Sequence, residues 1–110
     1  MEQSTSKIAA RIIVHGKGEA SVELIRHLSP ITVNALVMNM PIYGRVNRLN
    51  ESVVCVISQI TAGVEKSRLT FSRGDVAFLP LNGSICIFLK EGRSARPMNP
   101  VGRVSSGLEV

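Results

Sequence analysis

The residue types that most often carry chemistry are sparse in this chain of 110 residues and lie far apart. Cys55 and Cys86 each lie inside a strongly apolar run, where a free thiol behaves as a small buried hydrophobe. We therefore expect two reduced thiols rather than a disulfide. His15 has no second His, Cys or carboxylate at ligand spacing, so a surface position at a strand end suits it better than a metal site. The sequence predicts no metal ion and no cofactor.

The segment Gly16-Lys17-Gly18 raises the question of a phosphate-binding loop. Such a loop needs a third glycine and a helix that follows, and this segment has neither. Apolar and polar residues instead alternate on both sides of the glycines, over residues 7–16 and 20–25. This pattern predicts a β-hairpin with the glycines at its turn.

The charge balance favours anionic partners without identifying one. The chain has 13 Lys and Arg against 8 Asp and Glu, a formal net charge of +5, and its basic residues are scattered from Lys7 to Arg103. Three Phe, one Tyr and no Trp leave little surface on which bases could stack, so we do not expect a nucleic-acid partner. No apolar run approaches the roughly 18 to 20 residues that span a bilayer, so we expect no membrane association.

Length and composition predict one domain. Hydrophobic residues make up 45% of the chain and charged residues 19%, which suits a single compact core. We expect residues 1–6 to form a polar N-terminal lead and residues 7–110 a single domain. The lead has none of the architecture of a signal peptide, so we expect a cytoplasmic protein.

Most of the chain has the period-two pattern of antiparallel β-strands. Beyond the hairpin, five more strands are expected, at residues 43–49, 52–58, 74–79, 83–90 and 100–107. We interpret residues 59–72 as a long connection over the surface. A closed barrel would remove the exposed edges that so many short strands otherwise present.

One segment departs from this pattern and predicts a helix from Pro30 to Met40. Ser29 suits an N-cap, Pro30 suits the first helical position, and Pro41 prevents continuation. Its apolar surface runs most of the way round, so we expect a buried helix that caps an open end of the barrel. The predicted fold class is mainly β: a closed antiparallel barrel of about seven or eight strands with one buried capping helix.

The order of several short motifs resembles cyclophilins. Residues 18–36 (GEASVELI, then SPITVNAL) resemble their opening, and GDVAFLPLNGSICIFLKEG followed by NPVGRVSSGLEV resembles their ending. The chain is most similar to the small bacterial and archaeal cyclophilin-like family, barrels of about this length, from Ile8 to Val110. The resemblance implies a cyclophilin-like barrel. It places Cys86 and Phe88 in the barrel interior and Ile85, Ile87 and Leu89 on the groove side.

Cyclophilins are peptidyl-prolyl isomerases, and the resemblance allows their groove to be compared with this chain. Their chemistry needs an Arg aimed at the prolyl amide and a largely aromatic pocket for the proline ring. Arg48 lies near the position of that Arg, but Val46 and Asn47 stand where the family has Phe and His. Ile85, Cys86 and Ile87 replace a Gln and two Phe. We therefore do not expect an efficient isomerase, and Arg48 is the catalytic candidate only if the chain catalyses this reaction.

Three hypotheses of function remain open at the level of the sequence. The first is a binding module that holds a small apolar ligand or a peptide segment in a groove beside residues 84–89. Its candidate ligand-binding residues are Arg48, Tyr43, Phe78, Asn82, Ile85 and Ile87. The second is a weak prolyl isomerase that uses Arg48. The third is a structural or homo-oligomeric assembly protein in which another copy covers the same strip.

A plainer interpretation accompanies these hypotheses. Arg48 is then a solvated strand residue, and Ile85 and Ile87 belong to an ordinary packed wall. The hypotheses differ in whether a groove beside Ile87 is open in the monomer.

Overall fold

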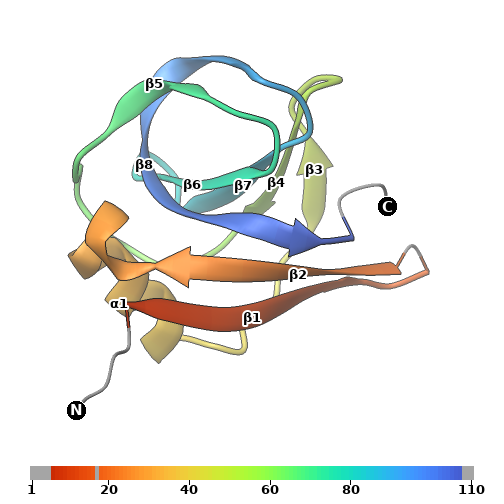
Figure 1. Ribbon diagram of the computed structural model, residues 1–110, viewed down its shortest axis with the longest axis horizontal. Coiled ribbons are helices and arrows are strands. Elements are labelled where there is room, and N and C mark those ends of the chain that lie inside the picture. The colour runs from red at the N-terminus through yellow and green to blue at the C-terminus, as the bar shows by residue number, and fades with distance from the viewer. Residues whose placement is uncertain (1–5, 17, 108–110) are drawn as a thin grey trace.

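The computed structural model describes residues 6–16 and 18–107, which are mainly β with a single α-helix, as expected (Figure 1). The expected lead, apart from Ser6, and the last three residues of the chain lie outside the described residues. The strands are β1 (Lys7–Val14), β2 (Gly18–Ile25), β3 (Val46–Arg48), β4 (Val53–Ile57), β5 (Arg68–Phe71), β6 (Asp75–Leu79), β7 (Ser84–Phe88) and β8 (Gly92–Ser106). The helical elements are the 3-10 helix η1 (Arg26–Leu28) and α1 (Pro30–Met38).

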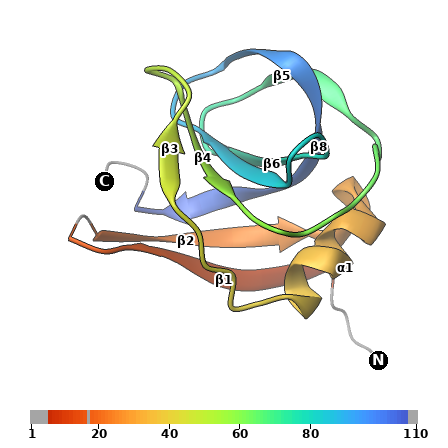
Figure 2. The same cartoon turned by 180° about the vertical axis from the view of Figure 1, so that it is seen from behind.

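The strands form an antiparallel half-barrel with the order β1-β2-β8-β6-β7-β4-β3, and β5 pairs with β8. In the view from behind, β3 and β4 stand at one side of the molecule and α1 lies near the end of the hairpin formed by β1 and β2 (Figure 2). No helix within the described ranges is long and apolar enough to cross a membrane.

Two hydrophobic cores lie on opposite faces of the wall formed by β6, β7 and β4. Alternate residues of a strand point to opposite faces of the sheet, so one wall can serve both cores. The first core consists of Val22, Leu24, Val33, Leu36, Val76, Phe78 and Val101. The second core consists of Val53, Cys55, Phe71, Ala77, Cys86, Phe88 and Met98. The expected orientation of β7 therefore holds, with Cys86 and Phe88 in the second core and Ile85 and Ile87 against the first.

Strand β8 runs through both cores and is longer than expected. It begins at Gly92, whereas the sequence pattern predicted a start at residue 100. Its first part pairs with β5, which lies inside the supposed connection 59–72, and its later part pairs with β6 and β2. The interpretation of residues 59–72 as a long surface connection missed β5, because β5 is short and its register with β8 shifts between Arg68 and Thr70. A strand pair with such a register shift shows little alternation of apolar and polar residues in its sequence.

Helix α1 ends at Met38, two residues before the predicted end at Met40. The amides of Asn39 and Met40 bond to carbonyls three residues earlier, and the Asn39 side-chain amide donates to the Ala35 carbonyl at 2.7 Å. These bonds tighten the last turn, and the residue before Pro41 is disfavoured in the α conformation.

The expected burial of α1 holds for one side of the helix and not for the other. Val33 and Leu36 are 0% and 1% exposed in the first core, while Ile31 is 72% and Met38 83% exposed. The helix lies against the first core on one side only, and an almost uniformly apolar sequence does not indicate which side that is.

The N-terminus of α1 is capped by Glu65, which is distant in sequence, rather than by the side chain of Ser29. The Glu65 carboxylate accepts hydrogen bonds from the backbone amides of Ile31, at 3.0 Å, and Thr32, at 2.8 Å. Burial on its own would raise the pKa of Glu65, but these bonds, the Thr32 hydroxyl and the nearby Lys66 charge hold that pKa below its ordinary value. The fully buried Asn99 accepts from the Glu65 amide at 2.9 Å and donates to the Thr32 hydroxyl at 3.0 Å. The loop before β5 is thereby fastened to α1 and β8.

Candidate functional site

Arg48 and Ile87, the two central residues of the predicted groove, lie in one cross-strand row. Arg48 of β3 pairs with Val54 of β4, and Val54 pairs with Ile87 of β7. Directly paired residues of antiparallel strands share a face of the sheet, so these three side chains project to the same side. Arg48 and Ile87 were predicted as site residues from the sequence, whereas Val54, which lies between them, was not.

A second row lies two residues further along and faces the same side. It contains Val46, Val56 and Ile85, in that order across β3, β4 and β7. We call the two rows together the β4–β7 face: Val46, Arg48, Val54, Val56, Ile85 and Ile87. The face is apolar except at Arg48.

Exposure on the β4–β7 face is greatest at β3. Ile85 and Ile87 are half-buried and pack against the first core, so each is a wall residue with part of its surface accessible. Val54 and Val56 are also half-buried, and Val46 is 40% exposed. The accessible part of the predicted groove is therefore the side next to β3.

The guanidinium of Arg48 lies at the border of this face. Its Nη1 donates to the backbone carbonyl of Glu51 at 3.3 Å, in the turn between β3 and β4, and the side chain is exposed. Asn47 alternates with Arg48 and faces the other side. In this geometry Arg48 can attract an anionic or carbonyl group that rests on the valines.

The other predicted site residues do not form one cluster. Phe78 pairs with Ile85 but is 0% exposed in the first core, so a ligand on the surface does not reach it. Tyr43 is 84% exposed in the segment between α1 and β3. Asn82 is exposed in the β6–β7 turn, where its Oδ1 accepts from the Ser84 amide at 3.1 Å. That bond shapes the turn that leads into Ile85.

Three members of the β4–β7 face, Val46, Val54 and Val56, were not among the candidate site residues predicted from the sequence. A signal for the two on β4 exists, because the strand 52–58 and the strand 83–90 each carry a cysteine near the centre. Aligning Cys55 with Cys86 places Val54 beside Ile87 and Val56 beside Ile85, which is the register observed.

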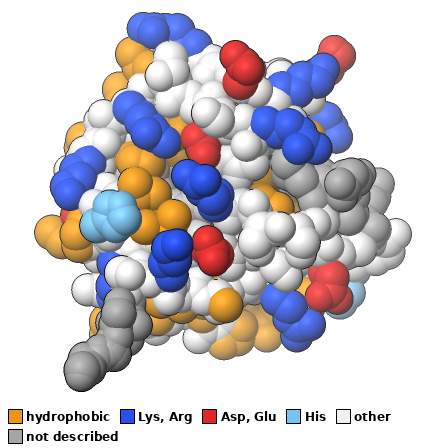
Figure 3. All heavy atoms as spheres, viewed as in Figure 1, with side chains coloured by type: hydrophobic (Ala, Val, Ile, Leu, Met, Phe, Trp, Pro, Cys, Tyr) orange, Lys and Arg blue, Asp and Glu red, His pale blue; other side chains and the backbone are white. Residues whose placement is uncertain are grey.

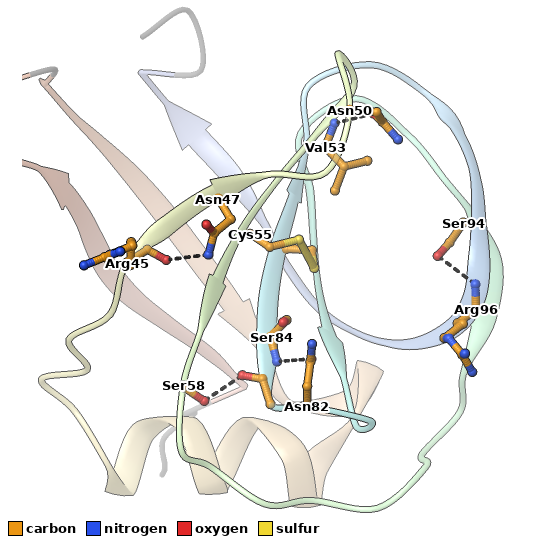
Figure 4. The surroundings of a disulfide bond; sticks show 12 residues. Arg45, Asn47, Asn50, Val53, Cys55, Ser58, Asn82, Ser84, Ser94 and Arg96 are labelled. Carbon is orange, nitrogen blue, oxygen red and sulfur yellow. Dashed lines mark hydrogen bonds between the residues drawn. A yellow bond between two sulfur atoms is a disulfide. The ribbon is translucent and has the colours of Figure 1, made fainter.

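The prediction of two reduced thiols was wrong, because Cys55 and Cys86 form a disulfide in the structure. The two residues are directly paired between β4 and β7, with their Cα atoms 4.1 Å apart and both side chains in the second core. Figure 4 shows this bond midway along the wall, with Asn50 and Asn82 towards its opposite ends. The prediction that both cysteines have apolar surroundings is confirmed, but it did not include the direct pairing of β4 with β7. A cytoplasmic location stays a prediction.

Two hollows lie beside the start of β8, and none of the predicted site residues lines either of them. One, of about 480 Å³, is lined by Arg68, Thr70, Phe71, Ser72, Asp75, Glu91 and Gly92. The other, of about 370 Å³, is lined by Asn50, Glu51, Ser52, Val53, Phe88, Gly92 and Arg93. Phe71 stacks on Phe88 beneath them, with ring centroids 4.6 Å apart. Both hollows have mixed charge and an aromatic floor that is almost fully buried.

Charged side chains do not gather into one patch on the face that Figure 3 draws. On the face drawn in Figure 3, Lys and Arg side chains are spread among apolar and polar ones rather than gathered in a stripe. In the part of the chain that the structure describes, no three His, Cys, Asp or Glu residues group as metal ligands.

The comparisons with known proteins identify one family and one similar structure. A family model described as Cyclophilin-like matches residues 8–110. The solution structure of the hypothetical protein AF2241 from Archaeoglobus fulgidus is similar, with 27% sequence identity and a TM-score of 0.79 over 94% of this chain and 84% of that one. No curated protein matches the chain.

Proposed function

Because the chain belongs to the cyclophilin-like family, we propose that it is a binding module whose β4–β7 face holds a small apolar ligand or an extended peptide segment. The observation that carries this proposal is the pair of cross-strand rows, five aliphatic side chains with one Arg at their border. Binding sites of this kind combine an apolar surface with a few polar groups that fix orientation. A ligand with an apolar body and a carbonyl or anionic end matches this arrangement.

Binding is better supported than prolyl isomerisation. An isomerase of this fold needs a guanidinium aimed at the prolyl amide nitrogen, and Arg48 here donates towards the Glu51 turn. Ile85 and Ile87 offer no hydrogen-bond donor, and Cys86 is enclosed in the second core with Cys55. The two aliphatic rows can bind a peptide segment without catalysing the isomerisation of its prolyl bond.

The test is a titration followed by backbone amide chemical shifts. The probes are anilinonaphthalene sulfonate, which has an apolar body and an anionic group, and a short apolar peptide that contains proline. We expect the largest shift changes at Val46, Val54 and Ile87. Changes confined to residues around Gly92 would contradict the proposal.

A pair of variants provides the control for this titration. Val46→Glu places a carboxylate on the β4–β7 face beside Arg48 and should abolish the changes. Leu81→Glu alters another exposed aliphatic residue, 66% exposed in the β6–β7 turn, and should leave them intact. An equal loss of the chemical-shift changes in both variants would overturn the assignment of the binding site to the β4–β7 face.

A further inference from the structure

Strand β1 is a long, regular and unpaired edge. The sheet path ends on β1 at one side and on β3 at the other, within the described residues. β3 has three residues, whereas β1 has eight that pair with β2 without a register shift, from Lys7 with Ile25 to Val14 with Gly18. Figures 1 and 2 both show β1 at the outer margin of the sheet. Proteins usually protect such edges with short strands, bulges, proline or charged side chains. β1 is long and has no bulge or proline, and its two charged residues, Lys7 and Arg11, lie on its exposed face.

The hydrogen-bonding register identifies the backbone groups that β1 presents to its free side. The Arg26 amide donates to the Ser6 carbonyl at 2.8 Å, which makes Ser6 and Arg26 a hydrogen-bonded pair. Such pairs alternate along an antiparallel ladder, so the even-numbered residues of β1 direct their backbone groups towards β2. The odd-numbered residues, Lys7, Ala9, Arg11 and Ile13, direct theirs away from the sheet.

The side chains of β1 set the requirements for a strand that pairs with this edge. Ile8, Ala10 and Ile12 are half-buried and pack against the first core, so the neighbouring strand must place apolar residues on that face. Lys7 and Arg11 lie on the opposite, exposed face, where a directly paired cation would be repelled. Part of the Arg11 charge is compensated by Glu19 of β2, at 3.2 Å.

We propose that β1 pairs antiparallel with β1 of a second copy of this chain, with a twofold axis at Ala10. Because the outward backbone groups belong to odd-numbered residues, one residue of β1 must face its own copy on the axis. An axis at Ala9 would place Lys7 opposite the partner's Arg11, and an axis at Arg11 would place two Arg11 side chains together. An axis at Ala10 pairs Ile8 with the partner's Ile12, Lys7 with Ile13 and Ala9 with Arg11. It keeps apolar residues on the core side and separates the cations.

The proposed interface is small. One added strand buries less than the roughly 1,200 Å² of a standard interface, so we expect a weak dimer whose population depends on protein concentration. The dimer forms independently of the binding proposed for the β4–β7 face, since it uses the opposite edge of the sheet.

Cysteine substitutions test both the contact and its register. In the proposed dimer the two copies of residue 10 form a non-hydrogen-bonded pair with Cα atoms about 4.5 Å apart. Cys55 and Cys86 form a disulfide at a similar Cα separation within the chain. We expect mild oxidation to cross-link Ala10→Cys into a dimer on a non-reducing gel, and to leave Ala9→Cys and Arg11→Cys largely monomeric. Preferential linking of either control would overturn the register, and linking of none would overturn the dimer.

Two charge variants at Ala9 separate dimerisation from chain stability. Within the chain Ala9 pairs with Glu23, whereas in the proposed dimer it faces the partner's Arg11. Ala9→Lys should therefore stabilise the monomer while weakening the dimer about fivefold, and Ala9→Glu should do the reverse. Sedimentation equilibrium measures the strength of the dimer, and denaturant melts measure the stability of the folded chain. The proposal is overturned if the wild-type protein stays monomeric to about 500 μM. This conclusion holds even if an unrelated peptide is found to pair with the β1 edge.

Discussion

Glu65 Oε1 accepts two hydrogen bonds of 2.8 Å from Thr32, one from its backbone amide and one from its hydroxyl. Thirty-three positions separate these residues in the sequence, so the start of α1 is completed by a residue that the chain reaches only after β4. The carboxylate takes the place of a local N-cap side chain. It also lies at the positive end of the helix dipole.

Glu65→Ala should lower the free energy of unfolding by about 1 kcal/mol at pH 7, the usual cost of losing an N-cap. Since the pKa of Glu65 is depressed in the folded state, the stabilisation is present above the ordinary value of 4.5 and is lost as the pH falls through the folded pKa. Urea melts from pH 7 to pH 3 should show the two proteins converging at the acid end. Glu51→Ala, at an exposed acidic residue, is the control, and the same pH profile for both variants would contradict this role for Glu65.

Loss of the Cys55–Cys86 disulfide should destabilise the protein substantially. The bond closes a loop with a sequence separation of 31 residues, for which chain entropy gives about 3 to 4 kcal/mol. Urea melts of the double variant Cys55→Ala with Cys86→Ala measure the loss. Thiol titration of the denatured wild-type protein should find no free thiol without reductant and two after reduction. Two thiols in the unreduced sample would show that the bond does not form.

The two sides of α1 should respond differently to truncation. Leu36 is 1% exposed in the first core and Met38 is 83% exposed. Leu36→Ala should lower the free energy of unfolding by about 2 to 5 kcal/mol, because it opens a cavity in the first core. Met38→Ala should change that free energy by no more than about 0.5 kcal/mol. Denaturant melts of the two variants provide the comparison. A loss well under 1 kcal/mol for Leu36→Ala would contradict the capping of the first core by α1.

Gly102 should not tolerate a side chain, because β8 passes very close to β2 at this position. A Cβ on Gly102 would collide with the carbonyl oxygen of Glu23, whereas a Cβ on Gly92, in the same strand, would meet nothing within 4 Å. Gly102→Ala should therefore destabilise the protein by about 1 to 3 kcal/mol, and Gly92→Ala should be nearly neutral. Equal melting midpoints for the two variants would show that the strands separate at little cost.

The chain should accelerate prolyl isomerisation hardly at all. Removing one positioned polar group typically costs on the order of a hundredfold in rate, and here Ile85 and Ile87 stand where several such groups are needed. A protease-coupled assay on a short proline peptide should give the uncatalysed rate, with no change in Arg48→Ala. Efficient catalysis that Arg48→Ala removes would establish the isomerase in place of the binding module.

The sequence predicted the fold well wherever strands were regular. The alternation of apolar residues located β1, β2, β4, β6 and β7 within a few residues, and it assigned Cys86 and Ile87 to opposite faces correctly. It failed for β5 and for the first part of β8, where the register shifts and Pro97 interrupts the pattern. Alternation of apolar and polar residues indicates a strand that pairs without interruption, so a strand with a shifted register shows little alternation.

The candidate site was only partly predictable, because a site depends on which strands are neighbours. Arg48 and Ile87 do share a face, but Val54 lies between them only because β4 pairs with both β3 and β7. The burial of Phe78 and the exposure of Tyr43 depend on how the hairpin and α1 pack over the wall. Those contacts join residues far apart in the chain, which local patterns do not encode.

Strand β8 also has a consequence for synthesis. It supplies Met98 to one core and Val101 to the other, and it hydrogen-bonds with β2, β5 and β6. Every other strand is translated before it, so both cores wait for the same late segment. A nascent chain that ends before β8 should be digested readily by proteases, and native protection should appear only when β8 is complete and outside the ribosome. Pairing at such sequence separation is slow, so the nascent chain carries exposed aliphatic strands for longer than a helical protein of this size would.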